Sequence, residues 1–300
     1  MGGKNNFWPR LLRPGCEDIK AFRFNRHFFG NEPKSLQSLQ QKLTCLTFTP
    51  RSRIDINQTS RECDQIHAVK HTARHSVSLI NVSEGVSTIR SFFLDGPVGR
   101  LEALLNAGTD NATHAALVCH PHPMFGGTMH NKVAFHTMKA LNGFGFPVLR
   151  FNFRGAGLSE GEHDYGAGEA DDVSAALDWL TREFHLPLIL AGFSFGAAVG
   201  FYVACPDERV KAAIALGLPV SPMDGRDYEF HFLQHCAKPK LFISGSRDQY
   251  GSQARLREVL EFVPEPKQLV IVQDADHFFE GRLREMREAI ESWLRSTLQV

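Results

Sequence analysis

The chain has 300 residues, of which 43% are hydrophobic and 22% are charged, and its formal net charge is zero. That length and composition are typical of a globular protein with one main domain. The balanced charge gives no reason to expect nucleic acid or an anionic membrane surface as a partner. No stretch of roughly 18 uncharged apolar residues predicts a membrane span, and the N-terminus lacks the apolar core of a signal peptide.

The cysteines favour a reducing compartment. They form no Cys-x-x-Cys pair and no small-domain spacing, which argues against a disulfide framework and against a zinc ribbon. We therefore expect a cytoplasmic protein. The six cysteines are Cys16, Cys45, Cys63, Cys119, Cys205 and Cys236.

The first 75 residues differ from the rest in charge and texture. They carry thirteen Lys or Arg residues against six Asp or Glu residues, a net charge of +7, and they show no sustained apolar periodicity. We predict a poorly structured, flexible basic extension over residues 1–75 and a folded domain over residues 76–300. A weak helical pattern covers Lys34–Leu43. An organellar transit peptide and a misassigned start codon are alternative explanations of the extension.

Short apolar runs of strand length alternate with helical patterns from about Val86 onward. The first two strands are expected to pair antiparallel around Asp95-Gly96-Pro97, because these residues favour turns. This alternation predicts an α/β fold with a mostly parallel central sheet and helices on both faces. The predicted strands are Val86–Leu94, Arg100–Asn106, His114–His120, Phe146–Phe153, Leu186–Gly192, Val210–Leu216, Lys240–Gly245 and Gln268–Val272. The predicted helices are Asn131–Leu141, Gly168–Phe184, Phe195–Ala204, Gln253–Phe262 and Phe279–Leu298.

The run Gly192-Phe193-Ser194-Phe195-Gly196 matches the pattern Gly-x-Ser-x-Gly. The pattern alone is weak, but here an apolar strand leads into it and a helix of small residues leads out of it. A strand, a sharp turn and a helix are the setting that exposes a nucleophilic serine above a sheet. The alternative interpretation is a strand-to-helix turn without chemistry.

A serine hydroxyl needs a base to attack, and the base needs an acid that fixes its tautomer. His277 follows the last predicted strand and Asp248 follows the strand before it, both at the edge where open α/β sheets build their sites. We predict Ser194 as the nucleophile, His277 as the general base and Asp248 as the acid, in the chain order typical of such sites. Asp274 and Asp276 are rivals for the acid, but they lie too close to the histidine in the chain to reach its Nδ1 easily.

The segment Cys119–Gly127 follows a predicted strand and is the natural source of an oxyanion-hole amide. One donor is expected from Phe195, the residue after the nucleophile, and a second from this loop. Proline has no N–H, which leaves His122 or Met124, with His122 favoured. His120 and His122 also suggest a metal site, since imidazoles two apart on an extended segment point the same way. No further ligand completes it, and we predict neither a metal nor a cofactor.

The next strand leads into a glycine-rich run, Phe151–Ser159. It lacks the Gly-Lys-Ser/Thr ending of a phosphate-binding loop and does not match Gly-x-Gly-x-x-Gly. We interpret it as a structural turn. Arg154 is expected to support the neighbouring segment Cys119–Gly127, called the His-Pro loop below, or the substrate side of the cleft, together with His120.

Four segments taken together resemble a known family: HPHPMFGGTMHNKV, RFNFRGAGLSEG, GFSFGA and ADHFFEG. Over roughly Val86–Leu298 the chain is similar to a small bacterial branch of the α/β-hydrolase superfamily, near the dienelactone-hydrolase-like and Xaa-Pro-peptidase-like proteins. The resemblance implies the α/β-hydrolase fold and a Ser-Asp/Glu-His triad, which maps onto the three residues named above. Two positions depart from the wider superfamily: the usual His-Gly pair is His120-Pro121, and the usual Asp of the glycine-rich turn is Asn152. Dienelactone hydrolases use a cysteine nucleophile, so their substrate does not carry over.

These features predict a serine hydrolase that cleaves an ester, thioester or amide bond of a small or medium soluble substrate through an acyl-enzyme. Only some twenty residues join the strands Val210–Leu216 and Lys240–Gly245, so the cap over the site is expected to be minimal. The alternatives are an Xaa-Pro-type peptidase, which needs acids that bind a free peptide amine, and a catalytically silent binding protein with the same fold. The sequence leaves the acyl group, the leaving group and the oligomeric state open.

Overall fold

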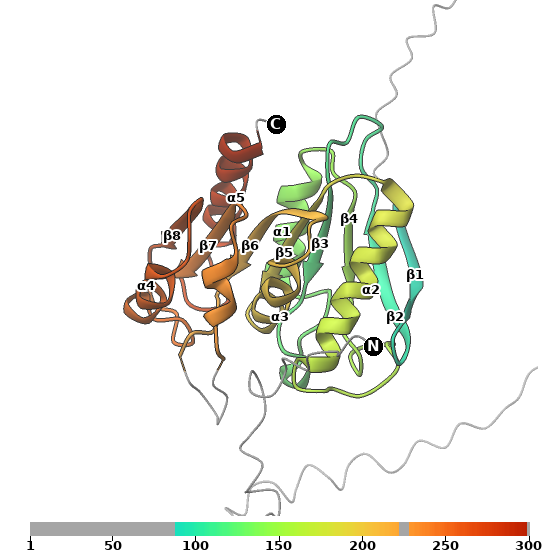
Figure 1. Cartoon of the computed structure of the whole chain (residues 1–300), viewed down its shortest axis with the longest axis horizontal. Coiled ribbons are helices and arrows are strands. Elements are labelled where there is room, and N and C mark those ends of the chain that lie inside the picture. Colours follow the sequence, from blue (N-terminus) through green and yellow to red (C-terminus); the bar gives the residue numbers. More distant parts are fainter. Residues whose placement is uncertain (1–87, 222–227, 299–300) are drawn as a thin grey trace, which may run out of the picture. The chain divides into compact units, whose positions relative to one another are not determined.

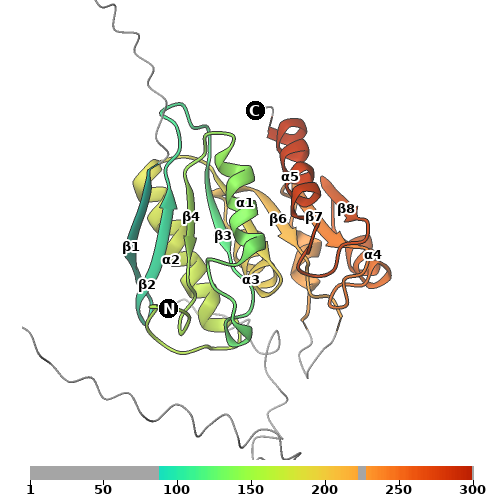
Figure 2. The ribbon, with the colours of Figure 1, turned by 180° about the vertical axis from the view of Figure 1, so that it is seen from behind.

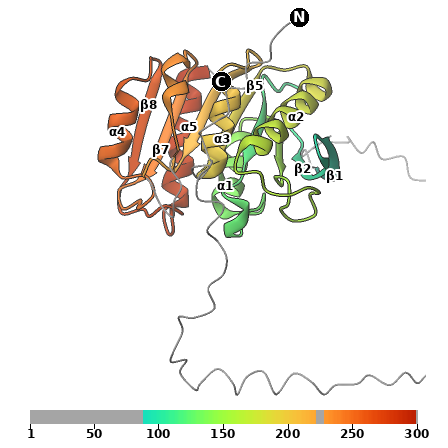
Figure 3. The same cartoon turned by 60° about the horizontal axis from the view of Figure 1, so that its bottom comes forward.

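A computed structural model describes residues 88–221 and 228–298. Its centre is an eight-stranded sheet with the strand order β1-β2-β4-β3-β5-β6-β7-β8 (Figure 1). β2 pairs antiparallel with β1 and β4, and all other neighbours pair parallel. The hairpin β1–β2 forms one end of the sheet, and β8 with α4 forms the other (Figure 3). The strands are β1 (Ile89–Gly96), β2 (Gly99–Asn106), β3 (Ala115–Cys119), β4 (Val148–Phe151), β5 (Leu188–Phe193), β6 (Val210–Leu216), β7 (Lys240–Gly245) and β8 (Lys267–Val272).

Helices cover both faces of the sheet. α1 and α5 pack on one face (Figure 2), and α2, α3 and α4 pack on the other (Figure 1). The helices are α1 (Lys132–Asn142), α2 (Ala167–Phe184), α3 (Phe195–Ala204), α4 (Gln253–Glu261) and α5 (Leu283–Leu298), with short 3₁₀ turns η2 (Pro123–Phe125) and η3 (His231–His235). This arrangement confirms the predicted α/β fold.

The central strands are apolar on both sides because both sides are covered. In β5, Ile189 and Ala191 face α1 and α5, whereas Leu188 and Leu190 face α2. Every residue of β5 is buried. A strand in this position cannot alternate apolar and polar residues, which explains the continuous apolar runs in the sequence.

One predicted helix boundary is wrong. The last helix begins at Leu283 rather than at Phe279. Phe279 and Gly281 have φ angles of 53° and 70°, in the left-handed region that a right-handed helix excludes. Phe279 is apolar and fully buried, so it fits the apolar periodicity of the helix that follows and was predicted as part of it.

Several predictions concern residues outside the described ranges. These are the extension over 1–75, its weak helix at Lys34–Leu43 and the first residues of the strand expected from Val86. The boundary at residue 75 therefore stays a prediction. In the described part of the connection between β6 and β7, η3 is the single regular element. No helix within the described ranges has both the length and the apolarity needed to cross a bilayer.

Candidate active site

Ser194 lies in a sharp turn between β5 and α3. Its φ and ψ angles are 54° and −118°, a strained conformation for a residue with a side chain. The glycines on either side leave no room for a Cβ atom: one added at Gly196 would lie 2.4 Å from the His120 carbonyl oxygen, and one at Gly192 would lie 2.3 Å from the Gly196 carbonyl oxygen. The turn therefore depends on both glycines, as the motif predicts.

A continuous hydrogen-bonded chain joins the three residues predicted as a triad. Ser194 Oγ lies 3.0 Å from His277 Nε2, and His277 Nδ1 lies 3.0 Å from each carboxylate oxygen of Asp248. The Asp248 side chain is 0% exposed, and its Oδ1 also accepts the amides of Tyr250 and Gly251 at 2.8 and 3.0 Å. An ionised carboxylate only accepts, so it holds the imidazole proton on Nδ1. The lone pair of Nε2 then faces the serine hydroxyl.

The two rival acids lie elsewhere. Asp276 Oδ1 accepts the amides of Phe278 and Glu280 at 3.0 Å each, which stabilises the turn after His277. The Asp274 side chain is 67% exposed, and its Oδ2 lies 3.9 Å from Arg282 Nη2. The local geometry of the turn directs both carboxylates away from the imidazole.

Several residues that surround His277 have no signal in the sequence. The rings of Phe193, Tyr250 and Phe278 lie 5.0, 4.5 and 5.3 Å from its ring centroid. Gly217 has a φ of 52°, and a Cβ atom there would lie 3.0 Å from the imidazole Cε1. These contacts surround the imidazole; Phe278 is its neighbour in the chain, but Phe193 at the end of β5, Gly217 after β6 and Tyr250 after β7 are brought to it by the fold.

The His-Pro loop lies against the first turn of α3. His122 precedes η2, and its Nδ1 accepts the amide of Met124 at 3.3 Å. The His122 ring lies 4.8 Å from the ring of Phe195, the residue after the serine. The loop and the α3 N-terminus are therefore neighbours, and the Met124 amide is engaged within the loop.

His120 is a structural residue of the loop. It is fully buried, its Nδ1 lies 2.6 Å from the Pro121 carbonyl oxygen, and its Nε2 accepts the Phe153 amide at 2.9 Å. Burial lowers the pKa of His120 to about 4, so the ring is neutral. Both nitrogens are engaged by the backbone, so this histidine offers a metal no lone pair and the pair with His122 is not a metal site. Among the residues described, no group of three His, Cys, Asp or Glu side chains is arranged to bind a metal.

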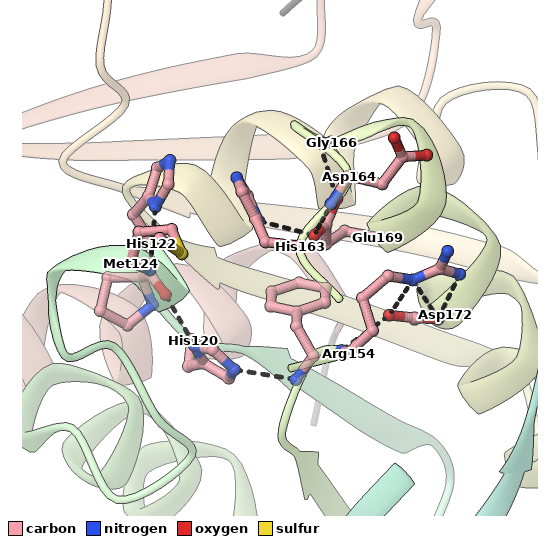
Figure 4. Close-up of polar contacts among 11 residues, drawn as sticks. His120, His122, Met124, Arg154, His163, Asp164, Gly166, Glu169 and Asp172 are labelled. Carbon is pink, nitrogen blue, oxygen red and sulfur yellow. Dashed lines mark hydrogen bonds and ion pairs between the residues drawn. The ribbon is translucent and has the colours of Figure 1, made fainter. Parts of the chain in front are cut away.

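Arg154 supports the glycine-rich turn through α2 and not through the His-Pro loop. Its guanidinium group donates to both carboxylate oxygens of Asp172, at distances down to 2.7 Å, and its amide donates to Oδ2 at 3.0 Å (Figure 4). The two side chains are 6% and 0% exposed. Gly168 makes space for this pair, because a Cβ atom there would lie 2.0 Å from Arg154 Nη1.

Asn152 links this turn to the end of the His-Pro loop. Its Oδ1 accepts the Met129 amide at 2.7 Å, and its Nδ2 donates to Glu102 at 2.7 Å. An aspartate cannot donate, so the amide is the side chain that satisfies both partners at once. The departure from the superfamily pattern at this position therefore has a local explanation.

A groove of about 410 Å³ lies beside the turn that follows His277, the middle residue of the hydrogen-bonded chain. One side of the groove is formed by the end of the His-Pro loop and the start of α1. The other side is formed by the turn after His277. Its lining residues are Gly126, Thr128, His130, Asn131, Lys132, Val133, Phe278 and Glu280.

Comparison with known proteins places the chain in a family. The model of the family described as alpha/beta hydrolase domain matches residues 118–299. An uncharacterized protein of Rickettsia prowazekii (strain Madrid E) is 35% identical over 210 residues, which are 67% of this chain and 87% of the relative. The chain therefore belongs to the α/β-hydrolase family, which confirms the resemblance drawn from its motifs.

Two solved structures extend the comparison. An alpha-beta serine hydrolase homologue from Coxiella burnetii is 36% identical, with a TM-score of 0.62, over 68% of this chain and 96% of that one. XC6422 from Xanthomonas campestris, described as an a/b serine hydrolase without lid, is 33% identical, with a TM-score of 0.61, over 69% of this chain and 94% of that one. The described domain is thus similar to serine hydrolases over almost their whole length.

Proposed function

We propose that this protein is a serine esterase that hydrolyses small or medium soluble esters through an acyl-enzyme. The observation that carries the proposal is the hydrogen-bonded chain from Ser194 through His277 to Asp248, with 3.0 Å at each step. That geometry is what a serine needs to lose its proton as it attacks a carbonyl carbon. The similarity to serine hydrolases from two organisms supports it.

In the proposed reaction, Ser194 Oγ attacks the ester carbonyl and passes its proton to His277 Nε2. The tetrahedral oxyanion binds the amides of Phe195 and His122. His122 is preferred over Met124 because the Met124 amide already donates to His122 Nδ1. The imidazolium then protonates the leaving alcohol, and a water activated by the same imidazole releases the acyl group.

The surroundings of the serine favour a moderately apolar ester. Three large apolar side chains close to the proposed oxyanion loop and to His277 are well exposed: Met124 and Phe125 at 68% each, and Phe278 at 48%. The groove beside Phe278 is open to solvent-borne substrates of moderate size. We infer that the alcohol part of the ester binds there, next to the imidazole that protonates it.

The decisive experiment is labelling of the full chain with a fluorophosphonate probe, which reacts with activated serines. Labelling of wild type and its loss in Ser194→Ala is the expected result. Ser246→Ala is the matched control, because the Ser246 hydroxyl accepts the Asp274 amide and has a structural role. Absence of labelling in folded wild type would contradict the proposal and favour a binding protein.

A substrate comparison then tests the type of bond. We expect hydrolysis of 4-nitrophenyl esters of short acids, abolished in Ser194→Ala. Hydrolysis of Xaa-Pro 4-nitroanilides without ester hydrolysis would instead favour the peptidase. Amines are poorer leaving groups than alcohols, so an enzyme that cleaves only the amide must bind the peptide specifically.

A further inference from the structure

A second buried histidine–carboxylate couple lies beside the proposed oxyanion hole. His163 Nδ1 lies 2.7 Å from Glu169 Oε1, and the two side chains are 7% and 0% exposed (Figure 4). Glu169 also accepts the amides of Asp164 and Gly166 at 3.0 and 2.7 Å. Burial alone raises the pKa of Glu169, but the hydrogen bonds from His163 and from these amides lower it below its ordinary value. The carboxylate is therefore ionised, and its distance of 2.7 Å from His163 Nδ1 favours a proton on that nitrogen.

The other nitrogen of this imidazole is buried without a partner. His163 Nε2 has no hydrogen-bond partner among the described residues, whereas Nδ1 lies within ion-pair distance of Glu169 without meeting the angle of a hydrogen bond. Buried polar atoms are nearly always paired, so an unpaired one next to a reaction site calls for a functional explanation. In the neutral imidazole with its proton on Nδ1, Nε2 is an acceptor. It therefore suits a group that donates a hydrogen bond.

Aromatic rings surround this acceptor. The ring centroids of His122, Tyr165 and Phe195 lie 4.7, 5.1 and 5.7 Å from that of His163. In Figure 4, His163 lies between His122 and Glu169. Tyr165 is 59% exposed, so one side of this ring faces solvent. Rings on several sides offer stacking surfaces to an aromatic group.

The strand order places the couple on the acyl side of the serine. His277 protonates the leaving alcohol, so the alcohol lies on the His277 side of the serine, in the groove that Phe278 and Glu280 share with the start of α1. Ser194 follows β5, and His163 follows β4, which lies on the opposite side of β5 from β7 and β8. The acyl group of a bound ester therefore extends toward His163.

We propose that His163 Nε2 accepts a hydrogen bond from a hydroxyl group on the acyl part of the substrate, and that the enzyme prefers hydroxy-substituted aromatic acyl groups. The inference rests on the proposed function, since it requires an ester bound at Ser194. His163 would determine specificity, Tyr165 and Phe195 would contact the aryl ring, and Glu169 would act as a positioning residue that fixes the tautomer.

The test uses phenyl esters of benzoic acids that carry either a hydroxyl or a methoxy group at ring position 3 or 4. Both groups have similar electronic effects, but only the hydroxyl donates a hydrogen bond. The measured quantity is the hydroxy-to-methoxy ratio of kcat/KM with the full chain. We expect this ratio, at one ring position, to fall roughly threefold to tenfold in His163→Asn, as a lost hydrogen bond predicts. Asparagine keeps a donor for Glu169 and removes the Nε2 lone pair.

Two further variants make the result decisive. Ser246→Ala, at a hydroxyl with a structural role outside the proposed acyl site, should leave the ratio unchanged. His163→Phe keeps the ring packing and replaces His163→Asn if the latter melts at a lower temperature. A ratio that is the same in wild type and in a folded His163 variant, at both ring positions, overturns the inference.

Fluorophosphonate labelling separates this outcome from failure of the proposed function. A protein that labels at Ser194 and hydrolyses the esters, but whose ratio does not depend on His163, contradicts only the acyl specificity. A folded protein that neither labels nor hydrolyses any of these esters contradicts both proposals.

Discussion

Replacement of Asp248 by asparagine should abolish catalysis by reversing the tautomer of His277. Oδ1 of Asp248 accepts two backbone amides, from Tyr250 and Gly251, so the oxygen of the new side chain must occupy that position. Its NH₂ group then takes the place of Oδ2, 3.0 Å from His277 Nδ1. The NH₂ group donates to Nδ1, whereas Oδ1, which also lies 3.0 Å from Nδ1, already accepts two amides; the tautomer with the imidazole proton on Nε2 is therefore favoured. The base then has no lone pair for the proton of Ser194.

The expected fall in kcat is about 10⁴-fold, the loss typical of this change in other triads, which corresponds to roughly 5 kcal/mol of barrier. The assay is hydrolysis of a 4-nitrophenyl ester at neutral pH, with a thermal melt to show that the isosteric variant remains folded. Asp276→Asn is the matched control, since that carboxylate accepts the amides of Phe278 and Glu280 and has a structural role in the turn. An Asp248→Asn variant that keeps more than about a tenth of wild-type kcat would refute the reasoning, because a reversed tautomer of His277 lowers kcat by much more than tenfold.

Three predictions concern stability, each measured as the free energy of unfolding in urea. Arg154→Met leaves the fully buried Asp172 carboxylate without its cation and should lower the free energy of unfolding by about 3 to 5 kcal/mol. The control Arg255→Met breaks an exposed ion pair and should lower it by less than about 1 kcal/mol. Equal losses in the two variants would contradict a stabilising role of the buried pair. Gly196→Ala forces a Cβ atom to 2.4 Å from the His120 carbonyl oxygen and should cost at least about 1 to 3 kcal/mol; a neutral effect would mean that the turn relaxes. His120, with a folded-state pKa of about 4 against an ordinary 6.5, binds a proton in the unfolded chain before it does so in the folded one. Wild type should therefore lose about 3 kcal/mol more than His120→Gln as the pH falls from 6.5 to 4, and parallel pH profiles would contradict this.

The sequence by itself predicted the architecture and the three residues of the hydrogen-bonded chain. Each rests on a local pattern: continuous apolar runs that only a doubly covered strand tolerates, helical periodicity between them, and a serine between two glycines at a strand-to-helix turn. The residues proposed as acid and base could be found because parallel strands end at one edge of a sheet, so Asp248 and His277 had to approach that edge with Ser194. The prediction of where the last helix starts was wrong because Phe279 is apolar but has a left-handed backbone conformation, and the apolar periodicity carries no information on backbone angles.

Only the tertiary structure decided the partners of the supporting residues. Arg154 pairs with Asp172 on α2, His120 is held by two backbone groups, and His163 meets Glu169 beside the His-Pro loop. Sequence spacing brings a residue to an edge, but the direction of its side chain depends on how separate loops pack against one another. Hydrogen bonds require that direction to within a few tens of degrees and the distance to within a few tenths of an ångström, and those two quantities are set by the packing of the whole domain.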